Sequence, residues 1–234
     1  MARGASRGLG QIRRSRRCGG RERIRAQAQR VRGDRHGGDR EQRLGLDPLR
    51  RQGVALAYPA GVGGSWNAGR CCGLATRAAV DDVRYVLAVI RLEERRHPVD
   101  RRRVFLVGFS NGGMLAYSFA CAHAGVISAF AVVAGSLETR TCRPSRPLSV
   151  IDVQGDRDRV VPAAGTRFSR GAGASISSVA QSLRPWQQLA HGHATVRLVR
   201  LGLLGHEWPT LRRGRWDATS HLWHFLLTHA TPTS

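Results

Sequence analysis

The apolar residues of this chain fall into short runs that are separated by loops rich in glycine and polar residues. Short apolar runs bounded by turn residues are typical of strands in a buried sheet. Pro59 ends the first such run, because proline cannot donate a hydrogen bond to a neighbouring strand. We predict strands at residues 54–58, 104–107, 129–133, 148–153 and 196–201.

A helical pattern follows Asp81 and Asp82, either of which can cap the start of a helix. Apolar residues then recur with the spacing of one helix face, at Val83, Val86, Leu87 and Ile90. Arg95 and Arg96 suit the negative end of the helix dipole. Further helices are predicted at residues 111–123, around 175–190 and at about 217–229.

Strands that alternate with helices predict an α/β fold, with a mostly parallel sheet and helices on both of its faces. In such a sheet the functional site lies at the carboxyl ends of the strands. We therefore expect the functional residues in the loops that follow the predicted strands.

One of these loops carries a G-x-S-x-G motif, Gly108-Phe-Ser-Asn-Gly112, between a predicted strand and a predicted helix. A sharp strand-turn-helix connection holds the central serine in a strained backbone conformation with its hydroxyl exposed. Side chains two residues before and after the serine would clash there, so Gly108 and Gly112 are both expected to be required. Ser110 is the candidate nucleophile of a serine hydrolase.

Two later strands are followed by candidates for the acid and the base that such a serine needs. Asp158 follows the strand at 148–153, and His206 follows the strand at 196–201, in the chain order Ser, Asp, His. His206 would accept the Ser110 proton, and Asp158 would orient the imidazole. Asp156 is an alternative orienter, both aspartates could be turn residues, and His206 could be an ordinary core or loop histidine.

Other side chains are weaker candidates for a site. Trp66 and Trp208 would flank a mouth that accepts an aromatic or apolar acyl group, although ordinary packing explains them equally well. Two histidine pairs have spacings that a metal can use, but neither has an evident third ligand. Surface histidines without a metal are therefore the prediction. The pairs are His191 with His193, and His221 with His224.

The five cysteines do not form zinc-binding spacings. Cys121 could form a disulfide with Cys142. Cys71 and Cys72 are adjacent in a loop, and one of them could pair elsewhere. Five free thiols are the remaining alternative, and an odd number leaves at least one cysteine unpaired within the chain.

The charge separates an N-terminal segment, residues 1–40, from a catalytic domain at 41–234. The 234-residue chain has a formal charge of +22, contains no lysine, and has a net +10 within residues 1–40. This segment has no long apolar run, so neither a signal peptide nor a membrane-spanning helix is predicted. It could be a basic arm that binds polyanions, a solvated tail, or the product of a frameshift or wrong start codon. We do not expect nucleic acid as a partner.

Several motifs in this order resemble the polyhydroxybutyrate depolymerase and feruloyl esterase family of α/β-hydrolases. They are Trp66-Asn-Ala-Gly69, Val80-Asp-Asp-Val83, Gly108 through Met114, Asp158 through Pro162, and Gly205-His-Glu-Trp-Pro209. The resemblance implies an extracellular esterase that acts on polyesters or acylated polysaccharides through an acyl-enzyme, without a metal or a cofactor. It assigns Ser110 as nucleophile, Asp158 as acid and His206 as base. Family members usually carry His-Gly where this chain has Gln154-Gly155.

The resemblance also implies an oxyanion hole with two backbone donors. One is the N–H of Asn111, and the other belongs to a His-Gly loop after an earlier strand. Gly37, in His36-Gly37-Gly38, is a weak candidate for the second donor. No apolar strand precedes residue 41, so the N-terminal strands of the fold are expected to be missing or disrupted. The alternative function is a truncated, catalytically weak scaffold with a basic polyanion-binding arm.

Overall fold

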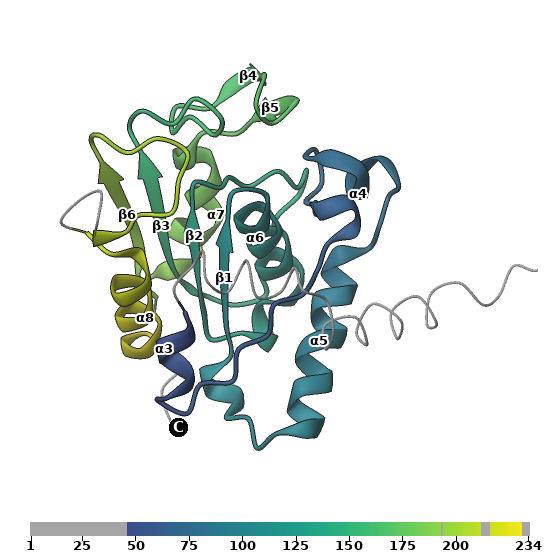
Figure 1. Cartoon of the computed structure of the whole chain (residues 1–234), viewed down its shortest axis with the longest axis vertical. Coiled ribbons are helices and arrows are strands. Elements are labelled where there is room, and N and C mark those ends of the chain that lie inside the picture. The colour runs from purple at the N-terminus through teal and green to yellow at the C-terminus, as the bar shows by residue number, and fades with distance from the viewer. Residues whose placement is uncertain (1–45, 193, 212–215, 231–234) are drawn as a thin grey trace, which may run out of the picture.

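A four-stranded parallel sheet forms the centre of the computed structural model, which describes residues 46–192, 194–211 and 216–230 (Figure 1). Its strands have the order β1-β2-β3-β6, and every neighbouring pair is parallel. They are β1 (Phe105–Phe109), β2 (Ala129–Val133), β3 (Ser149–Gly155) and β6 (Val196–Leu201). The predicted α/β class and four of the five predicted strands are confirmed.

Helices cover both faces of this sheet, and this explains why β2 and β3 are buried along their whole length. One apolar cluster joins the sheet to α5 (Asp82–Arg96), α6 (Asn111–His123) and α7 (Val179–Ala190). A second cluster on the opposite face joins it to α8 (Ala218–Thr228). Since the strands are parallel, their carboxyl ends meet at one edge of the sheet (Figure 1).

Caps set the helix boundaries. Asp81 is the residue that caps α5, and its carboxylate accepts a hydrogen bond from Arg84 N. Ser178 and Gln181 form a capping box that starts α7. The helix predicted from about residue 175 therefore begins later than expected. The residues before it form a small antiparallel hairpin of β4 (Thr166–Ser169) and β5 (Ala174–Ile176), which the sequence did not indicate.

The strand predicted at residues 54–58 is wrong. The chain there is extended but forms no ladder, and it follows a short helix, α3 (Asp47–Arg50). An extended segment becomes a strand only when its backbone groups find a partner strand. Within the described residues, β1 is the edge of the sheet and no strand lies beyond it. The glycine-rich loop that follows contains a 3₁₀ turn (Val62–Gly64) and α4 (Gly73–Arg77).

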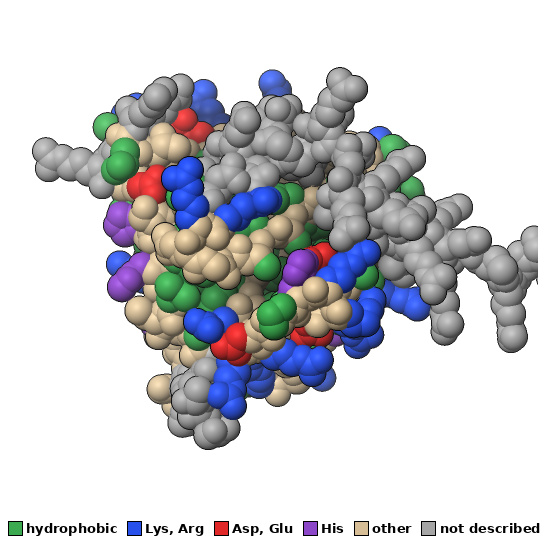
Figure 2. Space-filling view, turned by 60° about the horizontal axis from the view of Figure 1, so that its bottom comes forward, with side chains coloured by type: hydrophobic (Ala, Val, Ile, Leu, Met, Phe, Trp, Pro, Cys, Tyr) green, Lys and Arg blue, Asp and Glu red, His purple; other side chains and the backbone are tan. Residues whose placement is uncertain are grey.

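Two disulfides are present among the described cysteines. Cys121 on α6 is joined to Cys142 in the loop before β3, and Cys71 is joined to its neighbour Cys72. Cys18 and the whole basic segment at residues 1–40 lie outside the described residues. Arginine side chains are spread over the surface seen in Figure 2, with acidic side chains among them. No helix in the described part is long and apolar enough to cross a membrane.

Candidate active site

Ser110 lies at a tight turn between β1 and α6, at the carboxyl edge of the sheet. Its backbone has φ 54° and ψ −124°, a conformation that a residue with a side chain adopts at a cost. Ser110 N donates to Val133 O at 2.9 Å, and Met114 N donates to Ser110 O at 3.0 Å. Bonds to β2 and within α6 therefore hold the strained serine in place.

The glycines around Ser110 do not have equal roles. A Cβ atom on Gly108 would lie 2.3 Å from Gly112 O, so a side chain there is excluded, as predicted. A Cβ atom on Gly112 would meet only Trp66 Nε1, at 3.8 Å, which is an ordinary contact. The predicted steric need for glycine at position 112 is wrong. The second close approach is at Gly113, whose added Cβ would lie 2.8 Å from Val132 Cγ1.

The structure brings Ser110, His206 and Asp158 together in one hydrogen-bonded line. His206 Nε2 lies 2.8 Å from Ser110 Oγ, and His206 Nδ1 lies 2.8 Å from Asp158 Oδ2. The three residues come from the loops after β1, β6 and β3, which the parallel sheet places side by side. Phe109 packs on the imidazole with ring centroids 5.2 Å apart, a support that the sequence did not reveal.

Asp158 has all of the contacts expected of an orienting carboxylate. Its side chain is fully buried, and Oδ1 accepts hydrogen bonds from Val160 N and Val161 N, both at 2.8 Å. These two donors hold Oδ1 in place and leave Oδ2 directed at His206. The alternative orienter, Asp156, is exposed and pairs with Arg200 instead.

Asn111 joins the serine turn to the loop that carries Trp66. Its side-chain Oδ1 accepts from Trp66 N at 2.6 Å, and its Nδ2 donates to Trp66 O at 3.0 Å. The amide side chain is therefore occupied, and the sequence held no signal of this role. Its backbone N–H is one of the unpaired amides at the start of α6, which suits an oxyanion donor. The other predicted donor, Gly37, lies outside the described residues.

The two tryptophans predicted to flank the site differ in position. Trp66 stacks on Tyr85 with ring centroids 6.3 Å apart, and its loop is bonded to Asn111 beside the serine. Trp208 packs edge-on against Phe109, at 6.4 Å between centroids, and its indole donates to Thr219 on α8. Trp66 is therefore placed beside the serine turn, whereas the contacts of Trp208 connect the His206 loop to α8.

A separate buried acid, Asp152, lies within β3. Its carboxylate accepts hydrogen bonds from Tyr117 Oη at 2.6 Å and from Gln154 Nε2 at 2.7 Å. Burial raises the pKa of Asp152 to about 7, and the two hydrogen bonds only partly oppose this shift. Burial beside Asp152 also raises the pKa of Tyr117 well above its usual value, so Tyr117 remains a hydrogen-bond donor. Gln154, at the position where the family usually has histidine, also donates to Gly135 O.

Asp152 should make the stability of the protein depend on pH. The folded protein keeps this proton up to about pH 7, whereas the unfolded chain loses it near the ordinary value of 3.8. Because the unfolded state then binds fewer protons, the free energy of unfolding falls as pH rises from about 4 to about 7. Asp152→Asn should remove this part of the slope.

Urea denaturation of the wild type and Asp152→Asn across this pH range measures the effect. We expect the difference between their free energies of unfolding to change by a few kcal/mol, at about 1.4 kcal/mol per pH unit. Asp156→Asn, at an exposed position, is the matched control. Parallel pH profiles for the wild type and Asp152→Asn would contradict this assignment.

No metal site is evident in the part of the chain that the structure describes, because no group of three or more His, Cys, Asp or Glu side chains converges there. His221 stacks on Trp216, with ring centroids 4.5 Å apart, and its Nδ1 bonds to Asp217 O at 2.7 Å. His193 lies outside the described residues.

Comparison with known proteins finds relatives among esterases. Feruloyl esterase B of Piromyces equi is 31% identical over 105 residues, which are 43% of this chain and 19% of that protein. Feruloyl esterase C of Emericella nidulans is 29% identical over 117 residues, which are 50% of this chain and 40% of that protein. No protein-family model matches. The matched segments thus span well under two thirds of these relatives.

Solved structures agree on the fold. The protein Atu2452 of Agrobacterium tumefaciens, of unknown function, superposes with a TM-score of 0.50 at 15% identity, covering 79% of this chain and 83% of that one. With the parallel sheet and the serine turn after β1, this chain has an α/β-hydrolase fold. The resemblance to feruloyl esterases that its motifs predict is confirmed. Its resemblance to polyhydroxybutyrate depolymerases stays a prediction.

Proposed function

We propose that the protein hydrolyses carboxylic esters through an acyl-enzyme formed on Ser110. The observation that carries this proposal is the line of two 2.8 Å hydrogen bonds from Ser110 Oγ through His206 to Asp158 Oδ2. A serine in a strained, half-buried turn, hydrogen-bonded to an imidazole that a buried carboxylate orients, is the arrangement that activates a hydroxyl for attack.

In the first half of the reaction, Ser110 Oγ attacks the ester carbonyl carbon while His206 Nε2 accepts the hydroxyl proton. The carbonyl oxygen becomes an oxyanion, which the N–H of Asn111 would stabilise as one donor of the oxyanion hole. Collapse of the tetrahedral intermediate breaks the bond to the alcohol, which leaves with the proton from His206. Water then repeats these steps on the acyl-enzyme and releases the acid. Asp158 stabilises the imidazolium in both halves.

The names of the relatives suggest the substrate class. Two are feruloyl esterases, so feruloyl or similar acyl groups on a polysaccharide are the proposed substrates, with polyesters as the alternative. Trp66, beside the serine turn, is the proposed contact for an apolar acyl group. The proposed location is extracellular, and the disulfide between Cys121 and Cys142 suits an oxidising compartment.

A fluorophosphonate probe tests this function directly, because the oxygen of an activated serine displaces fluoride from its phosphorus and forms a phosphonate ester. We expect one label, which mass spectrometry locates on Ser110, together with hydrolysis of p-nitrophenyl acetate or butyrate. Ser110→Ala should lose the label, and Ser220→Ala, at an exposed serine of α8, should keep it. If the wild type shows no labelling and no turnover, the proposal fails and the catalytically weak scaffold is favoured.

A further inference from the structure

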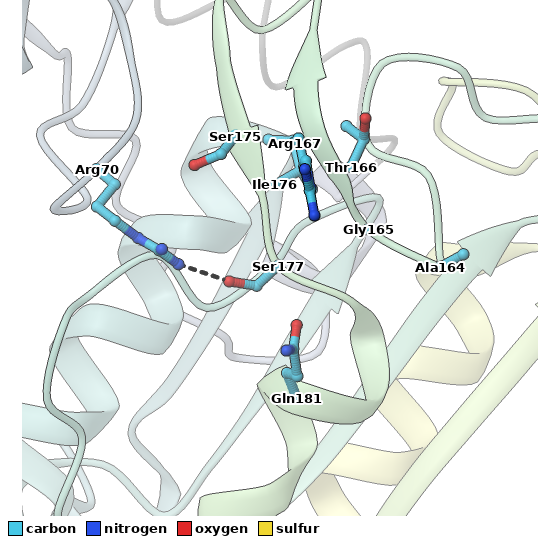
Figure 3. Close-up of a pocket in the computed structure, with 9 residues that line it drawn as sticks. All are labelled: Arg70, Ala164, Gly165, Thr166, Arg167, Ser175, Ile176, Ser177 and Gln181. Atoms are coloured by element: carbon cyan, nitrogen blue, oxygen red, sulfur yellow. Dashed lines mark hydrogen bonds between the residues drawn. The ribbon is translucent and has the colours of Figure 1, made fainter.

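A pocket of about 520 Å³ lies between the β4–β5 hairpin, the start of α7 and the loop that carries Arg70 (Figure 3). This volume is in the range of small-molecule sites, roughly 300–1,000 Å³. The pocket is not part of the Ser110, His206 and Asp158 line described above. Hydroxyl, amide and guanidinium groups share its described lining with Ala164, Gly165 and Ile176, and this lining includes no acidic and no aromatic residue.

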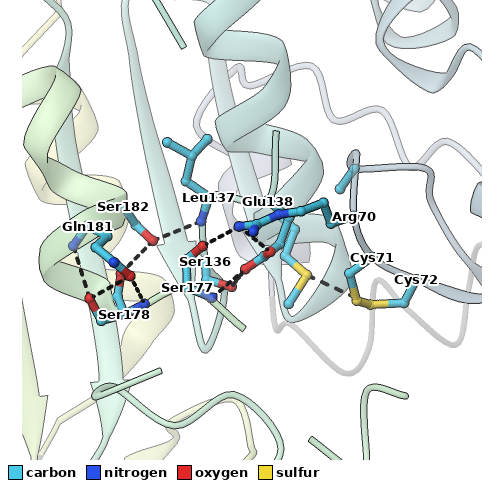
Figure 4. Close-up of polar contacts among 12 residues, drawn as sticks. Arg70, Cys71, Cys72, Ser136, Leu137, Glu138, Ser177, Ser178, Gln181 and Ser182 are labelled. Carbon is cyan, nitrogen blue, oxygen red and sulfur yellow. Dashed lines mark hydrogen bonds and ion pairs between the residues drawn. A yellow bond between two sulfur atoms is a disulfide. The ribbon is translucent and has the colours of Figure 1, made fainter. Parts of the chain in front are cut away.

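Arg70 is held rigidly at one wall of this pocket. Its guanidinium Nη2 donates to Ser177 Oγ at 2.8 Å and lies 3.2 Å from Glu138 Oε2 (Figure 4). Glu138 is completely buried, and its other oxygen accepts from Ser177 N and Ser136 Oγ, both at 2.8 Å. These contacts orient the Arg70 guanidinium before any ligand binds. Since 45% of the side chain remains exposed, the guanidinium is still accessible from the pocket.

Arg167 approaches the pocket from the opposite side. Its side chain extends from β4 into the space above Gln181, whose amide points toward it (Figure 3). The Arg167 side chain is exposed and makes no ion pair or hydrogen bond with any described residue. Glu138 compensates the charge of Arg70, so among the described residues the pocket has about one uncompensated positive charge, which belongs to Arg167.

We propose that this pocket binds the carboxylate of an acidic sugar unit. Guanidinium groups recognise carboxylates through paired, charge-assisted hydrogen bonds. The hydroxyls of Thr166, Ser175 and Ser177 offer partners for sugar hydroxyls, and the absence of aromatic lining disfavours a feruloyl ring. One uncompensated positive charge matches a carboxylate better than a phosphate ester, which carries about −1.5 to −2 at neutral pH.

The pocket is connected to the candidate active site at both walls. Arg70 belongs to the loop whose Trp66 exchanges two hydrogen bonds with Asn111. The hairpin that carries Arg167 is tied to the Asp158 loop, because Ser169 Oγ donates to Val160 O at 2.7 Å. A bound acidic sugar would thus contact the two loops that border the serine. That this sugar belongs to the ester substrate rests on the proposed function, whereas its binding does not.

Titration calorimetry with D-glucuronate tests the binding, with the neutral analogue D-glucuronamide as the matched ligand. We expect glucuronate to bind more tightly than the amide, and Arg167→Gln to weaken glucuronate binding by about ten-fold. Arg170→Gln is the matched control, because Arg170 is an exposed arginine of the same hairpin that does not line the pocket. It should bind glucuronate within about two-fold of the wild type. Thermal unfolding checks that both variants fold.

Four results would overturn this proposal. Three of them are equal binding of the acid and the amide, an equal loss in Arg167→Gln and Arg170→Gln, and no loss in Arg167→Gln. Glucose 6-phosphate is the third ligand, and tighter binding of it than of glucuronate would overturn the assignment to a carboxylate. The proposed function can fail separately. If glucuronate binding depends on Arg167 but no fluorophosphonate labelling occurs, the pocket proposal stands and the proposed esterase activity is refuted.

Discussion

Replacing Asp158 with asparagine should lower kcat for the proposed ester hydrolysis by about 10⁴-fold, because it would force the wrong tautomer on His206. Val160 N and Val161 N both donate to Oδ1 of Asp158. An asparagine must therefore place its carbonyl oxygen against these donors, and its NH₂ group then faces His206 Nδ1. The imidazole proton moves to Nε2 and points at Ser110 Oγ. Nε2 then has no free lone pair and cannot accept the hydroxyl proton.

The opposite orientation of the new amide would not restore the correct tautomer at low cost. It would set the NH₂ group against two backbone donors, of which Val161 N is buried, at a cost of roughly 1–3 kcal/mol for each buried unpaired group. The measurement is kcat for p-nitrophenyl butyrate, together with the rate of fluorophosphonate labelling, which should fall in parallel.

Asp156→Asn is the control for this substitution, because it removes the same charge from an exposed residue that pairs with Arg200. Its kcat should stay within about two-fold of the wild type, since exposed ion pairs contribute little. An Asp158→Asn protein with nearly full activity would mean that another group orients His206. Circular dichroism establishes that both variants are folded.

Replacing Gly108 with alanine should destabilise the protein by roughly 4 kcal/mol or more, or prevent it from folding. The new Cβ would lie 2.3 Å from Gly112 O, 2.4 Å from Gly112 C and 2.5 Å from Gly113 N. All three atoms belong to the backbone of the first turn of α6, so no side-chain rotation relieves the overlap. Either β1 or α6 must move, and both carry the turn at Ser110.

Gly112→Ala is the matched control for this prediction, because its added Cβ would meet only Trp66 Nε1, at 3.8 Å. We expect it to unfold at nearly the same urea concentration as the wild type. Urea denaturation of the two variants and the wild type measures the difference. Comparable losses of stability in both would refute the steric account of the turn.

Local patterns predicted most of the elements, for identifiable reasons. Strands β1, β2, β3 and β6 are short apolar runs flanked by turn residues, and their burial between helices requires that composition. The spacing of Val83, Val86, Leu87 and Ile90 reflects the single face that α5 buries. The segment at 54–58 has the same apolar character as the true strands, but a strand also needs a partner, and no local pattern reports one.

The sequence likewise predicted one part of the candidate site and left another part to the structure. Ser110, Asp158 and His206 were predicted by their positions after strands, because a parallel sheet brings all carboxyl strand ends to one edge. The choice between Asp158 and Asp156 needed the structure. Both follow β3 in the same loop, and only the turn around Val160 and Val161 buries one of them against His206.

The sequence by itself determined the α/β class, the strained serine turn and the order of its three candidate residues, because these depend on periodicity, glycine placement and chain order. Only the tertiary structure decided which carboxylate contacts His206, that Asn111 holds the Trp66 loop, and that Arg70 and Arg167 face one pocket. In each case the residues are far apart in the chain and are brought together by the packing of loops. Such contacts produce no periodic pattern in the sequence.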